Sequence, residues 1–205
     1  MLNTKKEKKE NVKSRYLSEK KISVTVIALV ALATTAFKSI PTKLVSNDTH
    51  ISFFSHTPLE DITSNNYKVV STLDQQTGDV AFSVPMQSFE FEKALMQKHF
   101  NSSDFLDTKK YPKAKFTGKI SNLNEVNFSK DGTYAANATG ELTIKEVTKP
   151  VNATGTITVL NGKVTLNSKM NITLADYNIS FTKGKPSTNV AKEVAVTITS
   201  VYAPI

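Results

Sequence analysis

Histidines and nearby carboxylates are the first residues of this chain that could do chemistry. The sequence holds three histidines, His50, His56 and His99, and His99 is followed closely by Asp104 and Asp107. Three histidines are sufficient by type for a zinc site, and a histidine beside an aspartate is a common general acid–base pair. However, no two of them have the H-x-x-x-H spacing that brings both onto one helix face. We therefore predict no metal site, and we interpret Asp104 as the cap of the short turn that follows it.

The motifs of the common enzyme classes are absent from the sequence. The chain has no G-x-S-x-G, no H-E-x-x-H and no glycine-rich phosphate loop, and only seven of its 205 residues are glycine. It has no cysteine, which excludes disulfides, a thiolate metal site and a cysteine nucleophile. We therefore expect a protein that is not an enzyme and that has no cofactor.

Aromatic side chains form the densest chemical pattern in the chain, and they suit the binding of an apolar ligand. Most of the pattern lies within residues 88–116. Aromatic and methionine side chains make a wide, adaptable wall for a flexible chain that offers no hydrogen bonds. The alternative is that these side chains are ordinary core, apart from His99, which we include as a contact for a ligand headgroup. The candidate lipid-binding residues are Phe53, Phe82, Met86, Phe89, Phe91, Leu95, His99, Phe100, Phe105, Tyr111 and Phe116.

The elements that must position these residues are predicted to be β-strands. Apolar residues alternate at period two over 80–86, 164–174 and 194–201, which gives each strand one apolar and one polar face. Asn161-Gly162 separates two such runs and predicts a type I′ hairpin. Many long, threonine-rich strands with short turns favour a mainly β fold, an antiparallel up-and-down barrel of about eight strands, over a sandwich.

One short helix interrupts the strand pattern, near residues 89–100. Its residues are good helix formers, and Phe91, Leu95 and His99 recur at i, i+4 and i+8 on one helical face. We expect this helix either to plug the barrel or to help line a cavity.

The N-terminal residues are predicted to direct export of the protein and not to form part of the folded domain. Residues 1–33 carry eight lysine or arginine residues and three glutamates, all of them before residue 22. The apolar stretch that follows them, 22–37, is shorter than the ~20 residues of a comfortable membrane span. We expect a signal peptide at 1–33, a connector at 34–46 and one barrel domain at 47–205. The alternative is an uncleaved membrane anchor through 22–37. Either way, the protein is expected in the periplasm, secreted, or held at the membrane.

The net charge of +8 is concentrated in this N-terminal segment, since the remaining residues carry a net of only +3. No arginine follows Arg15, so the bidentate base and phosphate contacts that arginine makes are absent from the predicted domain. We therefore expect no nucleic-acid partner.

Three blocks of the predicted domain, 99–116, 140–151 and 176–179, resemble the YceI-like family. His99–Asp107 (HFNSSDFLD) is similar to the family's H-L-x-S-x-D-F-F-D, and Tyr111–Phe116 (YPKAKF) is similar to its Y-P-x-I-x-F. Gly140–Val151 (GELTIKEVTKPV) resembles G-x-L-T-I-x-G-V-T-K-x-V, and a weaker block lies at Asp176–Ile179. The resemblance covers roughly residues 50–201 and implies an exported, lipocalin-like barrel that binds a polyisoprenoid or another long-chain amphiphile.

Departures from the family pattern leave the fold prediction intact, but one of them affects the ligand. Met96-Gln97 stands where the family has an Arg-Asp pair, and Glu146 replaces a glycine. The missing pair removes a charged anchor for a headgroup, so the resemblance implies an apolar ligand without defining its headgroup. We expect a long-chain, isoprenoid-like lipid as partner, with a homodimer as an open alternative. The competing hypothesis is a non-enzymatic, stress- or surface-associated barrel filled by its own phenylalanines.

Overall fold

A computed structural model describes residues 42–58, 60–180 and 191–202. The signal peptide and the anchor predicted within residues 1–37 lie outside these ranges. The strands are β1 Lys43–His56, β2 Asp61–Asp74, β3 Asp79–Pro85, β4 Glu90–Phe91, β5 Lys113–Ile120, β6 Gly132–Ile144, β7 Val147–Leu160, β8 Lys163–Thr173 and β9 Glu193–Tyr202. The helical elements are α2 Ala94–Asn101 and three short 3₁₀ turns, η1 Met86–Ser88, η2 Leu123–Glu125 and η3 Leu174–Tyr177.

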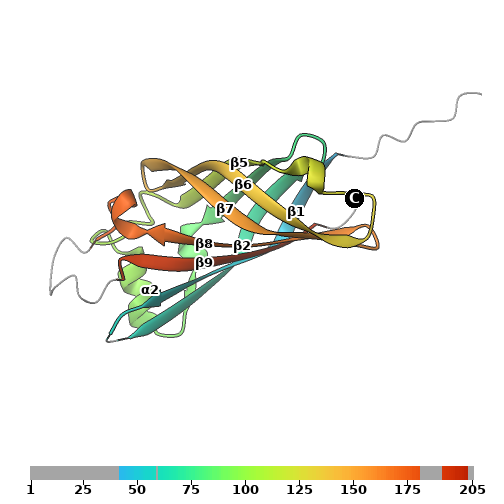
Figure 1. The fold of residues 1–205 in the computed structure, drawn as a ribbon. Coiled ribbons are helices and arrows are strands. Elements are labelled where there is room, and N and C mark those ends of the chain that lie inside the picture. The colour runs from blue at the N-terminus through green and yellow to red at the C-terminus, as the bar shows by residue number, and fades with distance from the viewer. Residues whose placement is uncertain (1–41, 59, 181–190, 203–205) are drawn as a thin grey trace, which may run out of the picture. The chain divides into compact units, whose positions relative to one another are not determined.

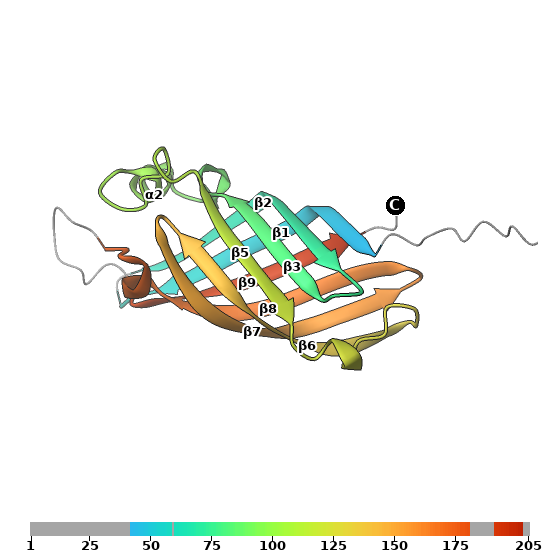
Figure 2. The same cartoon turned by 90° about the horizontal axis from the view of Figure 1, so that it is seen from above.

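Eight of the strands form a closed antiparallel barrel (Figures 1 and 2). Their order is β1-β9-β8-β7-β6-β5-β3-β2, and β1 also pairs with β2, which closes the sheet on itself. β4 pairs with β2 over only two residues and lies outside this circuit. The predicted up-and-down barrel of about eight strands is therefore confirmed. The barrel begins earlier than expected, because β1 starts at Lys43, within the segment predicted as a connector.

The predicted hairpin between β7 and β8 is confirmed. Asn161 and Gly162 have φ values of 52° and 76°, as a type I′ turn requires at both central residues. Leu160 pairs with Lys163 across the turn, so the turn fixes the register of two strands that run the length of the barrel.

The helix starts later than its sequence pattern predicts. Phe91 pairs with Ser64 of β2 in the short strand β4 instead of beginning the helix. The side chain of Gln97 stabilises this extended backbone, because its amide donates to the Phe89 carbonyl at 2.7 Å and accepts from the Phe91 N–H at 3.3 Å. The predicted face of Phe91, Leu95 and His99 is therefore wrong, and Leu95 is 60% exposed.

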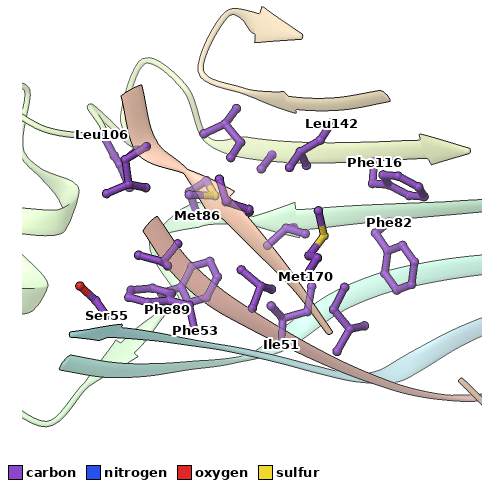
Figure 3. Close-up of a pocket in the computed structure, with 18 of the residues that line it drawn as sticks. Ile51, Phe53, Ser55, Phe82, Met86, Phe89, Leu106, Phe116, Leu142 and Met170 are labelled. Carbon is purple, nitrogen blue, oxygen red and sulfur yellow. The ribbon is translucent and has the colours of Figure 1, made fainter. Parts of the chain in front are cut away.

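The barrel interior has two different ends. At the packed end, where β1 begins and β9 finishes, the inward side chains of Val69, Leu73, Ile157, Val164 and Tyr202 are 0–1% exposed. At the cavity end, near α2, inward side chains surround a cavity (Figure 3). The candidate functional site is at this second end.

An apolar cavity as the candidate ligand site

The cavity has a volume of about 730 Å³. Small-molecule sites are typically clefts of ~300–1,000 Å³ with mainly apolar walls and a few polar groups, and this cavity has both properties. All eight barrel strands contribute to its wall, together with residues of α2 and the segment that follows it. The strand pattern produces this arrangement because alternate side chains of every strand point inward.

Four phenylalanines form a contacting cluster at the cavity end. Phe53 of β1 lies 5.4 Å from Phe89 and 5.9 Å from Phe100 of α2 between ring centroids, and Phe91 lies 5.0 Å from Phe100. These separations are typical of favourable aromatic pairs. The short strand β4 and the helix α2 are thus attached to the barrel through aromatic packing, and the same rings face the cavity.

A second aromatic pair lines another part of the wall. Phe82 of β3 and Phe116 of β5 lie 6.2 Å apart, away from Phe53 and Phe89 in Figure 3. The Phe116 ring lies close to Gly118, two residues further along β5, and to Gly140, the register partner of Gly118 on β6. A Cβ atom at Gly118 or Gly140 would lie 2.6 or 2.8 Å from Phe116 Cζ, so only glycine leaves room for the ring there.

The structure brings nine of the eleven predicted residues to the cavity wall and leaves two elsewhere. Leu95 projects from the exposed side of α2, and Tyr111 donates a hydrogen bond to Glu146 at 3.1 Å. Contact between a lipid and the other nine stays a prediction. The nine are Phe53, Phe82, Met86, Phe89, Phe91, His99, Phe100, Phe105 and Phe116.

Sequence reasoning missed the residues that make the cavity wide. Ala138 faces Ala153 across β6 and β7, Ala136 faces Gly155, and Gly155 faces Ser168 on β8. All five line the cavity, and we call them the small-residue wall. Their inward, period-two positions in β6 and β7 were the available signal, but small side chains do not stand out among threonines.

The polar residues of the cavity gather mainly near α2. Lys98, His99, Ser102 and Asp104 reach the wall from α2 and the turn after it, and Glu60 reaches it from the segment before β2. These are the positions at which a polar group on a ligand would find partners.

One ion pair ties the start of α2 to this region. The ammonium group of Lys93 pairs with the carboxylate of Glu60. The hydrogen bond with Glu60 raises the pKa of Lys93 above its usual value. The pair therefore connects the helix to the loop that leads into β2.

The three histidines do not share a site. His50 stacks on Tyr67 with a centroid separation of 4.5 Å, and His56 Nδ1 lies 2.6 Å from an Asp61 carboxylate oxygen. His99 is at the cavity end. Within the described residues, no group of three or more His, Cys, Asp or Glu side chains is placed to hold a metal ion.

Hydroxyl groups meet inside the packed end, where the first strand pairs with the last strand and with β2. The Thr49 hydroxyl lies 3.0 Å from that of Ser71 and 2.7 Å from that of Ser200, and the two serines also bond to each other. Burial raises the pKa of the neighbouring Tyr202 phenol. We call Thr49, Ser71 and Ser200 the hydroxyl cluster.

An eight-stranded up-and-down barrel that encloses an apolar cavity has the architecture of lipocalin-like proteins. Residues 43–202 match the model of the YceI-like domain. The chain therefore belongs to the YceI-like family, as the three sequence blocks predicted. Within the described residues, no helix is long and apolar enough to cross a membrane.

Curated relatives match over part of their length. A UPF0312 protein of Pseudomonas putida is 45% identical over 53 residues, which are 26% of this chain and 24% of the relative. Protein YceI of Escherichia coli O157:H7 is 38% identical over 71 residues, or 35% of this chain and 33% of the relative. The matched segments thus span about a quarter to a third of these relatives.

Solved structures match over most of the chain. A polyisoprenoid binding domain from Saccharophagus degradans, implicated in plant cell wall breakdown, superposes with a TM-score of 0.66 at 12% identity, covering 80% of this chain and 99% of that one. BcnA of Burkholderia cenocepacia superposes with a TM-score of 0.64 at 20% identity, covering 76% and 96%. At these identities the similarity establishes the fold.

Proposed function

We propose that this protein binds a long-chain apolar lipid, isoprenoid-like in character, inside the barrel. The observation that carries the proposal is the cavity of about 730 Å³ with its aromatic and aliphatic wall. Each CH₂ group that leaves water for such a cavity contributes ~0.8 kcal/mol, so a long chain can be held without a charged anchor. The mechanism is burial, and it requires no catalytic step.

The proposal agrees with what is described for a relative of the same fold. The structure from Saccharophagus degradans is that of a polyisoprenoid binding domain. We extend the ligand class to this chain because its own wall is mainly apolar along the barrel and most of its polar residues lie near α2. Met96 lies on the wall where the family has a charged residue, which favours apolar contacts over a charged clamp there.

The competing hypothesis, a barrel filled by its own side chains, describes the packed end only. That hypothesis expects the phenylalanines of the protein to fill the barrel interior. Instead, Phe53, Phe89 and Phe100 pack against one another on one side and leave the cavity beside them. A sequestering or carrying role is therefore the better interpretation.

We also propose that the lipid is bound after export. The basic residues before the apolar stretch 22–37 support a signal peptide or an anchor. Sequencing the N-terminus of the protein purified from its native host distinguishes the two, because a cleaved signal leaves a new terminus near residue 34. An intact N-terminus in the membrane fraction would support the anchor.

Lipid extraction tests the proposal directly. The protein is purified from its native host without detergent and extracted with organic solvent, and lipids are quantified by mass spectrometry. We expect an equimolar amount of one lipid class in the native protein. Finding no enriched lipid, with the same result after incubation with prenyl alcohols, would refute the proposal.

A matched pair of variants assigns any recovered lipid to the cavity. Ala138→Phe places a ring on the small-residue wall, and Ala195→Phe places the same ring on an exposed position of β9. We expect the first variant to retain less lipid than the parent protein and the second to retain the same amount. Equal lipid content in the two folded variants would show that the lipid binds elsewhere.

A further inference from the structure

The cavity is closed at its inner end. Along β7 its wall includes Ala153 and Gly155 and stops before the next inward residue, Ile157, which is fully buried. Along β8 it stops at Leu166, and Val164 below is 1% exposed. The packed end therefore forms a solid layer beneath the cavity.

Along β1 and β9, the cavity is bounded at its inner end by polar groups. Ile51 of β1 and Ile198 of β9 are register partners and line the cavity. The next inward residues on these strands, Thr49 and Ser200, are also partners, are buried and do not line it. On each of these two strands, the lining therefore changes from an isoleucine to a member of the hydroxyl cluster within two residues.

The hydroxyl cluster is a poor surface for an apolar chain to penetrate. Its members satisfy one another inside the barrel, and Ser71 and Ser200 are 0% exposed. A chain end that separated them would leave buried hydroxyls without hydrogen bonds, which is costly in an apolar interior. The cluster and the packed layer together make a floor that a ligand cannot pass.

The volume of the cavity above this floor limits the length of the ligand chain that fits inside the barrel. Because a protein cavity of about 150 Å³ holds one benzene molecule, each carbon atom needs about 25 Å³. The cavity of about 730 Å³ then accommodates a chain of about 30 carbon atoms. Carbons beyond that number stay outside the barrel.

We propose that this closed floor makes chain length the specificity determinant of the protein, with a limit of about 30 carbon atoms. The inference rests on the proposed lipid-binding function and adds to it the size class of the ligand. Affinity rises by about fourfold for each CH₂ group that is buried, and it stops rising when the cavity is full.

A length series of prenyl alcohols tests the limit. Delipidated protein is loaded with an equimolar mixture of chains from about 15 to 45 carbons in five-carbon steps, and the retained alcohols are quantified by mass spectrometry. We expect retention to increase up to the chain of about 30 carbons and to remain level beyond it. Retention that keeps increasing to the longest chain overturns the limit. No retention at any length instead contradicts the lipid-binding proposal itself.

Variants at the floor move the limit in opposite directions. Ala136 is the innermost wall residue of β6, and Ala135 beside it is exposed. The six-carbon ring added by Ala136→Phe should lower the limit by about one five-carbon unit and reduce retention of the 30-carbon chain at least tenfold relative to the 20-carbon chain. Ala135→Phe should leave the length profile unchanged, and identical profiles in the two variants would overturn the proposal.

Leu166→Ala provides a test that does not depend on inserting a large ring. It deepens the cavity by about three carbons, so chains just above the original limit should gain affinity relative to the 20-carbon chain. An unchanged profile in this variant, with the protein folded, would show that the floor does not set the length.

Discussion

The packed end and the cavity end of this barrel are built from the same strands but filled differently. Along β7 the inward residues are Ala153 and Gly155 at the cavity end and Ile157 and Val159 at the packed end. A barrel of about eight strands has an interior that its side chains can just fill. Each small residue at an inward position therefore leaves space that no neighbour occupies.

The aromatic residues alone do not explain the cavity. Phe53, Phe89 and Phe100 are large enough to fill much of the interior, but they contact one another near α2. The space lies between them and the small-residue wall of β6, β7 and β8. The cavity thus results from placing large side chains on one part of the wall and small ones on another.

The largest expected difference between the two ends is the cost of deleting an aliphatic side chain. Ile157→Ala removes a fully buried side chain from the packed end and should lower the free energy of unfolding by about 4 kcal/mol. Ile198→Ala removes one that faces the cavity and already lacks neighbours on that side, so the cost should be about 1–2 kcal/mol. Urea unfolding of the delipidated variants measures both values. Equal costs would mean that the cavity end is packed as tightly as the other.

Insertion of a larger side chain should also cost more at the packed end than at the cavity end. Val164→Phe adds volume to the packed end and should cost about 1–3 kcal/mol through strain. Val196→Phe projects into the cavity and should cost less than about 1 kcal/mol, because it fills empty space. Thermal unfolding of the lipid-free variants compares them. A larger loss for Val196→Phe would contradict the presence of a spacious cavity.

A smaller effect is expected from the hydroxyl cluster. Thr49→Val keeps the side-chain shape and removes the hydroxyl that bonds Ser71 and Ser200, so it should cost about 1–2 kcal/mol. Thr197→Val makes the same change on β9 away from the cluster and should stay within about 0.5 kcal/mol of the parent. If both variants unfold at the same urea concentration, the cluster does not stabilise the packed end.

Much of the fold was predictable because its signals are local. Period-two alternation predicted the strands, and Asn161-Gly162 predicted a hairpin that the structure confirms. The helix boundary was wrong because Gln97 holds the backbone of Phe89 and Phe91 in an extended form, which residue propensity does not report. Leu95 was expected on the cavity wall because it shares helical spacing with Phe91 and His99, but its side chain is exposed.

The site was less predictable because its decisive features depend on register. Thr49, Ser71 and Ser200 are separated by 22 and 129 residues along the chain, so no local pattern joins them. Ala138 and Ala153 became recognisable as wall residues only once β6 and β7 were paired. Large aromatic residues could be identified from the sequence, whereas the small residues that leave room for a ligand could not.

The smallest expected difference between the two ends is their response to pH. At the packed end, the backbone N–H groups of Thr77 and Gln76 donate to Asp74 and hold its pKa below the ordinary 3.8. Stability from this group is present above pH 3.8 and is lost as the pH falls through the folded-state pKa. At the cavity end, the pKa of Lys93 is raised above 10.5, so its contribution is present below pH 10.5 and is lost as the pH rises through the folded-state pKa. Melting temperatures measured against pH should show that Asp74→Asn flattens only the acid limb and Lys93→Met only the alkaline limb. An acid limb that is unchanged in Asp74→Asn would remove this turn as a source of the acid sensitivity.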